Sequence, residues 1–248
     1  HKVSETHYLD IFDKEPKLVD LRLKLIKEEI EELQDAFKNF DVVEVIDALS
    51  DILYVVYGMC AAFGISIDEH YRKYIKICSS YENRENVKND LTNFQLTKLL
   101  NNKRTNNYIL KDFSENCKDK DYFNLLKSNL DKIYKNYLNI ENGCNSKDFD
   151  IIIRYLLLLI NDTYTFGLLI NVNLDDSFAI VHDSNMTKIC NNEELAKETV
   201  SWYKSNDTKY DSPIYKHTEF GYIILNESTG KILKSIKYTP ANFSSLLN

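Results

Sequence analysis

The sequence predicts an all-α fold, and three features of its composition lead to that prediction. Only 6 glycines and 3 prolines occur in 248 residues, far fewer than a fold of many short strands and turns requires. Hydrophobic residues make up 44% of the chain, which is enough to bury a core. Long segments repeat apolar residues at helical spacing. We therefore expect a helical bundle with few turns.

Three helices are expected in the first third of the chain. The first runs from Lys17 to Phe40, and Pro16 stands where the first turn of a helix accepts proline. The stretch from Val42 to Phe63 is apolar on almost every side and ends at Gly64, as expected for a helix buried inside a bundle. A third helix is predicted from about Asp68 to Tyr81.

The helical pattern pauses and then starts again. The segment that follows the third helix is rich in Asn, Lys, Asp and Thr, so we expect a linker with one short helix around residues 91–100. Further helices are predicted at Tyr122–Leu138, which is amphipathic, at Phe149–Leu169, which is almost wholly apolar, and at Leu174–Cys190.

The second set of helices resembles the first in sequence. Leu25–Leu33 aligns with Leu125–Ile133, and Ile65–Tyr71 aligns with Val172–Phe178 in the same order. A tandem duplication explains both matches. The predicted domain organisation is a first helical unit at residues 1–82, a linker at 83–120, a second and degenerate helical unit at 121–192, and a tail at 193–248.

The tail is expected to contain one helix and a small β-hairpin. One more helix is predicted to end near Lys204, followed by strand candidates at Phe220–Leu225 and Lys231–Ile236. The expected fold is therefore an all-α bundle of two tandem units with a small C-terminal β-hairpin.

Charge and cysteine usage exclude several classes of protein. A net charge of −7 argues against general nucleic-acid binding, and an anionic substrate would need metal ions as intermediaries. The five cysteines are odd in number and form no C-x-x-C pair, so neither a disulfide framework nor a zinc site is indicated. We expect no membrane span and no signal peptide. A cytoplasmic protein without nucleic-acid or membrane partners is predicted.

Five acidic residues are the candidate metal ligands. Glu28, Glu29 and Glu32 share the first helix, and a solvated acidic face is the ordinary alternative for them. Asp47 and Asp51 stand one turn apart on the apolar helix, where an unpaired carboxylate is costly to bury. Helices joined by a short loop pack antiparallel, so all five carboxylates are expected to converge. Dense oxygen ligands suit Mg²⁺, or Mn²⁺ as a substitute, better than zinc.

The run from Leu21 to Gly58 resembles the MazG and phosphoribosyl-ATP pyrophosphohydrolase-like superfamily, which also includes all-α dUTPases. That family is marked by E-E-x-x-E on one helix and E-x-x-D on the next, and the first helix fits the first part fully. In the second part Asp47 takes the place of the glutamate that precedes Asp51, whereas Glu44 to Asp47 fits E-x-x-D in another register. We favour Asp47 and Asp51.

A second stretch of resemblance covers Phe178–Pro240. Similar family members carry V-H-x-S-N-M-[ST]-K, then G-K-x-x-K and a tyrosine, and the resemblance implies that this segment holds the nucleotide. Lysine ammonium groups suit phosphates, although plain solubility explains lysines in a charged tail equally well. The implied substrate-binding residues are His182, Asn185, Lys188, Lys231, Lys234 and Tyr238.

The acids have no counterparts in the second copy. The alignment sets Ser128, Asn129, Lys132, Arg154 and Leu158 against Glu28, Glu29, Glu32, Asp47 and Asp51. Single-copy family members are implied to pair as dimers, so this chain resembles a dimer fused into one monomeric polypeptide. One site is expected, with metal ligands from the first copy and the Ser184-Asn185-Met186 segment from the second.

The resemblance implies hydrolysis of a nucleoside triphosphate between its α and β phosphates. Glu29 or Glu32 would position or deprotonate the attacking water. Phosphoribosyl-ATP is the alternative substrate. A helical interaction module that has kept the fold without activity is the alternative from another class, and the intact acids of the first copy argue against it.

Overall fold

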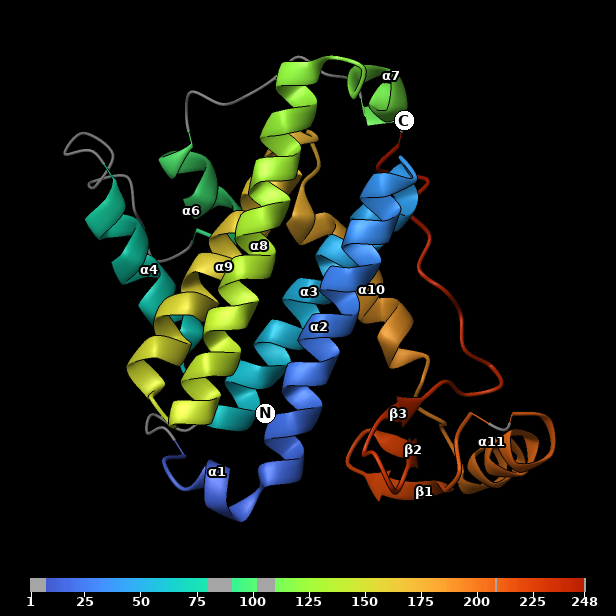
Figure 1. Cartoon of the computed structure of the whole chain (residues 1–248). Coiled ribbons are helices and arrows are strands. Elements are labelled where there is room, and N and C mark those ends of the chain that lie inside the picture. Colours follow the sequence, from blue (N-terminus) through green and yellow to red (C-terminus); the bar gives the residue numbers. More distant parts are fainter. Residues whose placement is uncertain (1–7, 80–90, 102–109, 208, 248) are drawn as a thin grey trace. The chain divides into compact units, whose positions relative to one another are not determined.

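A computed structural model describes residues 8–79, 91–101, 110–207 and 209–247 of the chain (Figure 1). The chain divides into two compact units, one formed by residues 1–178 with 243–248 and the other by residues 179–242. The boundary falls within helix α10 (Leu174–Met186), which ends earlier than the predicted Cys190.

Two helical hairpins form the bundle of the first unit. Helix α2 (Pro16–Lys38) packs along α3 (Val42–Phe63), and α8 (Lys120–Ser146) packs along α9 (Phe149–Leu169) (Figure 1). The hairpins meet where α3 contacts α9 and where α2 contacts α8. These four helices confirm the predicted helical architecture, and α8 is longer at both ends than the sequence pattern indicated.

Shorter helices surround this bundle. They are α1 (Ile11–Lys14), α4 (Ile67–Cys78), α6 (Asn93–Leu100), the 3₁₀ turn η1 (Leu110–Asp112) and α7 (Phe113–Asn116). The predicted short helix is confirmed as α6, which Thr92 and Gln95 begin with reciprocal side-chain to backbone hydrogen bonds. Helices α4 and α6 pack on each other and on α9. The predicted end of the third helix at Tyr81 and parts of the expected linker lie outside the described residues.

The two hairpins turn in the same way. The hydroxyls of Tyr57 and Tyr164, residues 107 positions apart, lie 3.3 Å from each other where α3 meets α9. At the same spacing, Phe40 and Lys147 both adopt a left-handed backbone with φ of 55°. The next residue in each case is an aspartate that accepts hydrogen bonds from two backbone N–H groups at the start of α3 or α9.

The buried positions of the first helices repeat at this spacing too. Each buried residue of α2 has a buried residue of α8 107 positions later in the chain. The residues of α2 are Val19, Leu23, Ile26, Ile30, Leu33, Ala36 and Phe37, and those of α8 are, in the same order, Leu126, Leu130, Ile133, Tyr137, Ile140, Gly143 and Cys144. The counterpart of α2 therefore begins one heptad later than the sequence alignment placed it. Seven residues make nearly two helical turns, so an apolar stripe matches itself in either register.

Two helices meet the length and composition of a membrane span. Both α3 and α9 are long and apolar enough to cross a bilayer, contrary to the expectation that no apolar run reaches that length. Most of each apolar stretch is buried inside the bundle. Burial between neighbouring helices thus accounts for their composition.

The second unit packs a helix on a small sheet. Helix α11 (Glu193–Asn206) contacts β1 (Pro213–Thr218) and β2 (Gly221–Asn226), and β2 also pairs with β3 (Ile232–Leu233). All pairings are antiparallel, in the order β1-β2-β3. The predicted hairpin is present as β2 and β3, but β1 was not predicted. Its central residues lack alternating burial, so it carries little strand pattern.

Substitutions at the helix ends are expected to test the left-handed positions. Gly64, with φ of 68°, follows α3, and Gly64→Ala should lower the free energy of unfolding by about 1 kcal/mol because a Cβ is disfavoured there. Lys147→Gly should raise it, since Lys147 holds φ of 55° and its ion pair with Asp13 is exposed. Urea unfolding measures both. Equal stability of Gly64→Ala and the parent protein would contradict this account.

Candidate active site

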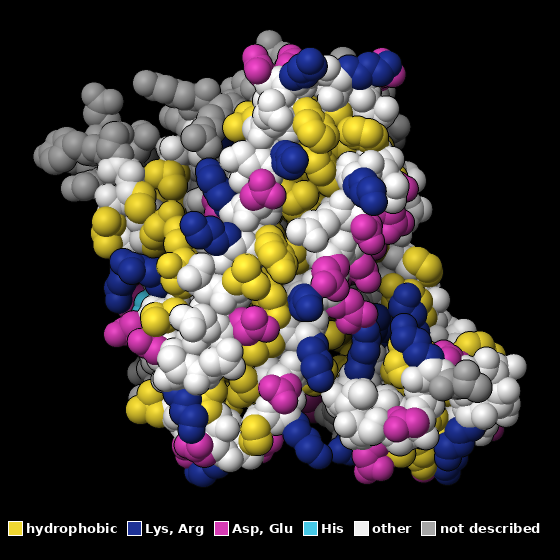
Figure 2. All heavy atoms as spheres, in the orientation of Figure 1, with side chains coloured by type: hydrophobic (Ala, Val, Ile, Leu, Met, Phe, Trp, Pro, Cys, Tyr) yellow, Lys and Arg dark blue, Asp and Glu magenta, His cyan; other side chains and the backbone are white. Residues whose placement is uncertain are grey.

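The acids of α2 border its buried stripe. Ile26 and Ile30 are fully buried, while Glu28 and Glu29 beside them are half-buried and Glu32 is exposed. Acidic side chains gather over α2 on the face seen in Figure 2. Because helical neighbours lie three or four residues apart, these three carboxylates project from adjoining turns of one side.

The aspartates of α3 are less exposed than the glutamate near its start. Asp47 and Asp51 are half-buried, one turn apart, whereas Glu44 is exposed in the first turn. A carboxylate in the first turn is stabilised by the helix dipole without any ligand. The position of Glu44 thus has an ordinary structural explanation, and the two half-buried aspartates do not share it.

Asp51 affects the tyrosine one turn further along α3. Burial raises the pKa of Tyr54, and the negative charge of Asp51 raises it further. The Tyr54 ring lies 5.7 Å from the Phe178 ring. The charge of Asp51 therefore acts on a partly buried hydroxyl one turn away on the same helix.

The donor atoms of this region fit a hard divalent cation in their chemistry. Five carboxylates on two packed helices supply oxygen ligands of the kind Mg²⁺ prefers. Across the described ranges of the chain, no three His, Cys, Asp or Glu side chains are close enough together to form a group that could hold a metal. The carboxylates are therefore the right kind of ligand for Mg²⁺, but their described positions do not form a group around one point.

Three of the predicted substrate-binding residues meet in the second unit. The ammonium groups of Lys188 and Lys234 lie 5.8 Å and 4.5 Å from the centre of the Tyr238 ring. The Tyr238 hydroxyl is 3.0 Å from Ser184 Oγ, which also donates to the carbonyl of Thr239 at 2.8 Å. Ser184 was part of the sequence motif but was not predicted as a site residue.

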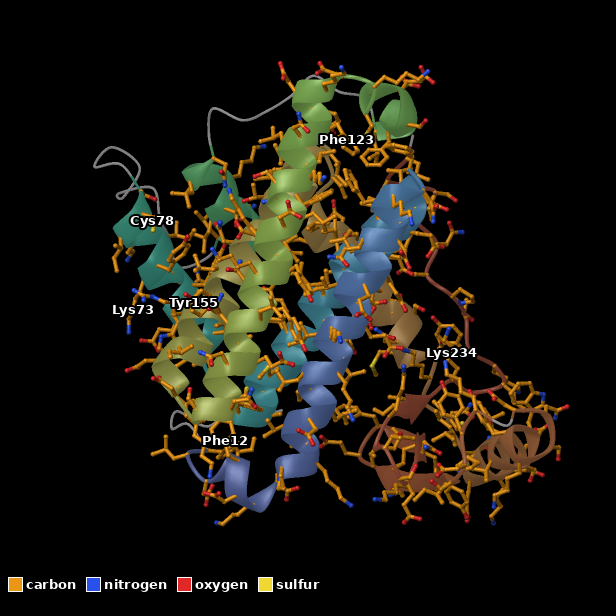
Figure 3. The ribbon with its side chains drawn as sticks, viewed as in Figure 1. Phe12, Lys73, Cys78, Phe123, Tyr155 and Lys234 are labelled. Carbon is orange, nitrogen blue, oxygen red and sulfur yellow. The ribbon has the colours of Figure 1, made fainter. Side chains whose placement is uncertain are left out.

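The other three predicted residues belong to the same unit. His182 is exposed and Asn185 is half-buried, both on α10. Lys231 is half-buried after the turn at Gly230, which has φ of 72°. Lys234, labelled in Figure 3, follows β3, and its carbonyl accepts a hydrogen bond from the Tyr203 hydroxyl at 3.0 Å. This bond holds the backbone on which Lys234 stands.

The second hairpin lacks the acids. At the spacing of 107, the counterparts of Glu28, Glu29, Glu32, Asp47 and Asp51 are Lys135, Asn136, Asn139, Arg154 and Leu158. The sequence alignment set Ser128, Asn129 and Lys132 against the three glutamates, and the other two pairs are the same at either spacing. The Asn136 amide donates to Asp162 at 2.9 Å. Amide, cationic and apolar side chains thus stand where the first hairpin has carboxylates.

Comparison with known proteins gives two matches. Residues 9–76 match the family model described as phosphoribosyl-ATP pyrophosphohydrolase, a stretch that includes all five acids. The "Uncharacterized protein L479" of Acanthamoeba polyphaga mimivirus is 34% identical over 258 residues, which span 100% of this chain and 90% of the viral protein. No solved structure matches the chain significantly.

Proposed function

The chain belongs to the MazG-like superfamily of all-α NTP pyrophosphohydrolases, and from this we propose that it hydrolyses a nucleoside triphosphate between the α and β phosphates. The products are the nucleoside monophosphate and pyrophosphate. The observation that carries the proposal is the family match over the first hairpin, because that hairpin holds the acids and the second has lost them.

The metal ligands proposed for Mg²⁺ are Glu28, Glu29, Glu32, Asp47 and Asp51. When bound, the cation lowers the pKa of a coordinated water and neutralises charge on the phosphate oxygens. The half-burial of both aspartates supports the register that uses Asp47 with Asp51 over the one that uses Glu44.

Two further roles are proposed for side chains of the chain itself. Glu29 or Glu32 orients the attacking water and takes its proton. Lys188 and Lys234 bind the nucleotide, a role supported by two ammonium groups at one tyrosine ring.

Phosphoribosyl-ATP is a second candidate substrate because the matching family model carries that description. A screen of the eight common NTPs and dNTPs together with phosphoribosyl-ATP, in millimolar Mg²⁺, separates the two by pyrophosphate release. Turnover of one or more nucleoside triphosphates supports the proposal. Turnover of phosphoribosyl-ATP alone assigns the second substrate, and no turnover of any compound favours a non-catalytic helical module.

Magnesium should stabilise the folded protein if the acids bind it. A ligand that binds only the folded state adds about 2.7 kcal/mol at a concentration 100 times its Kd, so the Tm should rise with Mg²⁺ concentration. Thermal scans in EDTA and in increasing MgCl₂ measure this effect, with NaCl at matched ionic strength as the control. A Tm that does not change with Mg²⁺ concentration would contradict the proposed ligands.

A further inference from the structure

Arg22 of α2 lies against a glycine of α3. A Cβ atom added at Gly58 would stand 2.8 Å from Arg22 Nη1 and 3.6 Å from Cζ. Any side chain larger than hydrogen at Gly58 would therefore displace the guanidinium. The pair of residues lets a cationic group rest directly on the backbone of the neighbouring helix.

The guanidinium is partly withdrawn from water, and the described residues place no acidic partner beside it. Its Nε is buried and finds no hydrogen-bond acceptor among the described residues. Burial lowers the pKa of Arg22, and no described carboxylate opposes that shift. A charge that is dehydrated and unpaired is costly, so buried arginines normally have an anion beside them.

The position of Arg22 relates it to the proposed metal ligands. Arg22 precedes Glu29 by two helical turns on α2, and Gly58 follows Asp51 by two turns on the antiparallel α3. Two turns correspond to about 10 Å along a helix axis. The α2–α3 pair therefore carries the carboxylates at one level and the Arg22 guanidinium about two helical turns away.

The second hairpin has lost this pair together with the acids. At the spacing of 107, Arg22 corresponds to Asn129 and Gly58 to Thr165. Asn129 is also buried, and its side-chain oxygen has no partner among the described residues. The second hairpin thus has an uncharged side chain at the arginine position and no glycine to accommodate a guanidinium.

We propose that Arg22 binds the phosphate chain of the substrate, with Gly58 making room for its guanidinium. This deepens the proposed function: the chain of phosphates extends along the α2–α3 pair from the carboxylates toward Arg22. The planar guanidinium donates two parallel hydrogen bonds to phosphate oxygens, which a single ammonium group does not.

Binding of inorganic tripolyphosphate in millimolar Mg²⁺, measured by isothermal titration calorimetry, tests this role without turnover. Arg22→Gln should weaken binding by about tenfold to a hundredfold, the range expected for a lost charge-assisted hydrogen bond. With the nucleotide that the enzyme hydrolyses, Arg22→Gln should raise KM at least as strongly. Asn129→Ala, the matched change in the second hairpin, should leave both values unchanged.

A second variant covers the possibility that Arg22→Gln fails to fold. Gly58→Ala keeps the positive charge of Arg22 but displaces its guanidinium, and it should weaken tripolyphosphate binding severalfold. Wild-type affinity and KM in a folded Arg22→Gln protein overturn the inference, as does an equal loss in Asn129→Ala. Hydrolysis with an unchanged KM in Arg22→Gln rejects the role of Arg22 alone. Arg22-dependent tripolyphosphate binding without hydrolysis of any nucleotide retains the anion site and rejects the proposed activity.

Discussion

Asp51→Asn is expected to abolish turnover and leave the fold intact. An amide is a weaker and uncharged ligand for Mg²⁺, so the proposed cation would be lost or displaced. The loss in kcat should exceed the roughly 10–100-fold effect seen when only an outer partner of a metal ligand is removed. Pyrophosphate release under saturating nucleotide measures it, and circular dichroism checks the fold.

The thermal behaviour of this variant should separate a ligand from a structural residue. Asp47 and Asp51 stand one turn apart on α3 and like charges at that spacing repel in the absence of metal, so Asp51→Asn should melt in EDTA at the same temperature as the parent or higher. Its response to Mg²⁺ should largely disappear. Asp35→Asn removes an exposed acid of α2 outside the proposed set and should behave as the parent does. A folded Asp51→Asn protein with near-normal activity would remove Asp51 from the site.

Most of the helical architecture was predictable from the sequence because it depends on apolar periodicity. The helices α2, α3, α8 and α9 all carry that pattern, and scarce glycine and proline left few places to interrupt it. The residue-to-residue alignment of the two hairpins was harder to predict from the sequence. Apolar spacing repeats every seven residues, whereas the left-handed turns at Phe40 and Lys147, which lie 107 residues apart, have no glycine to mark them.

The candidate site was predictable to different degrees. Glu28, Glu29 and Glu32 stand out because their spacing matches a known family motif, whereas Asp47 and Asp51 fit it less closely, and the structure adds that both aspartates are half-buried. The contact between Arg22 and Gly58 depends on how two helices pack, and although a glycine inside a helix is unusual, the sequence does not show which side chain lies against it. The meeting of Lys188 with Lys234 at one ring depends likewise on tertiary folding of segments distant in sequence.

Glu32→Gln is expected to lower kcat by about 10²–10⁴-fold, the contribution typical of a positioned general base. Glu32 is exposed, so this change should cost little stability, and the loss should appear in catalysis alone. Steady-state kinetics with the preferred nucleotide and a urea unfolding curve measure the two effects on the same preparation. A parallel loss of stability and activity would assign Glu32 a structural role.

Matched changes in the second hairpin show whether one hairpin alone is catalytic. Asn139 is the counterpart of Glu32 at the observed spacing, and Lys132 is its counterpart in the sequence alignment. Asn139→Ala and Lys132→Ala should both leave kcat nearly unchanged, whichever register is correct. The reason is electrostatic: Lys135 and Arg154 occupy the positions of two acids and would repel a divalent cation. Calorimetry should accordingly find one nucleotide bound per chain. Two equivalent sites, or a loss in either variant as large as that of Glu32→Gln, would mean that the second hairpin takes part in catalysis despite having no counterpart of the acids.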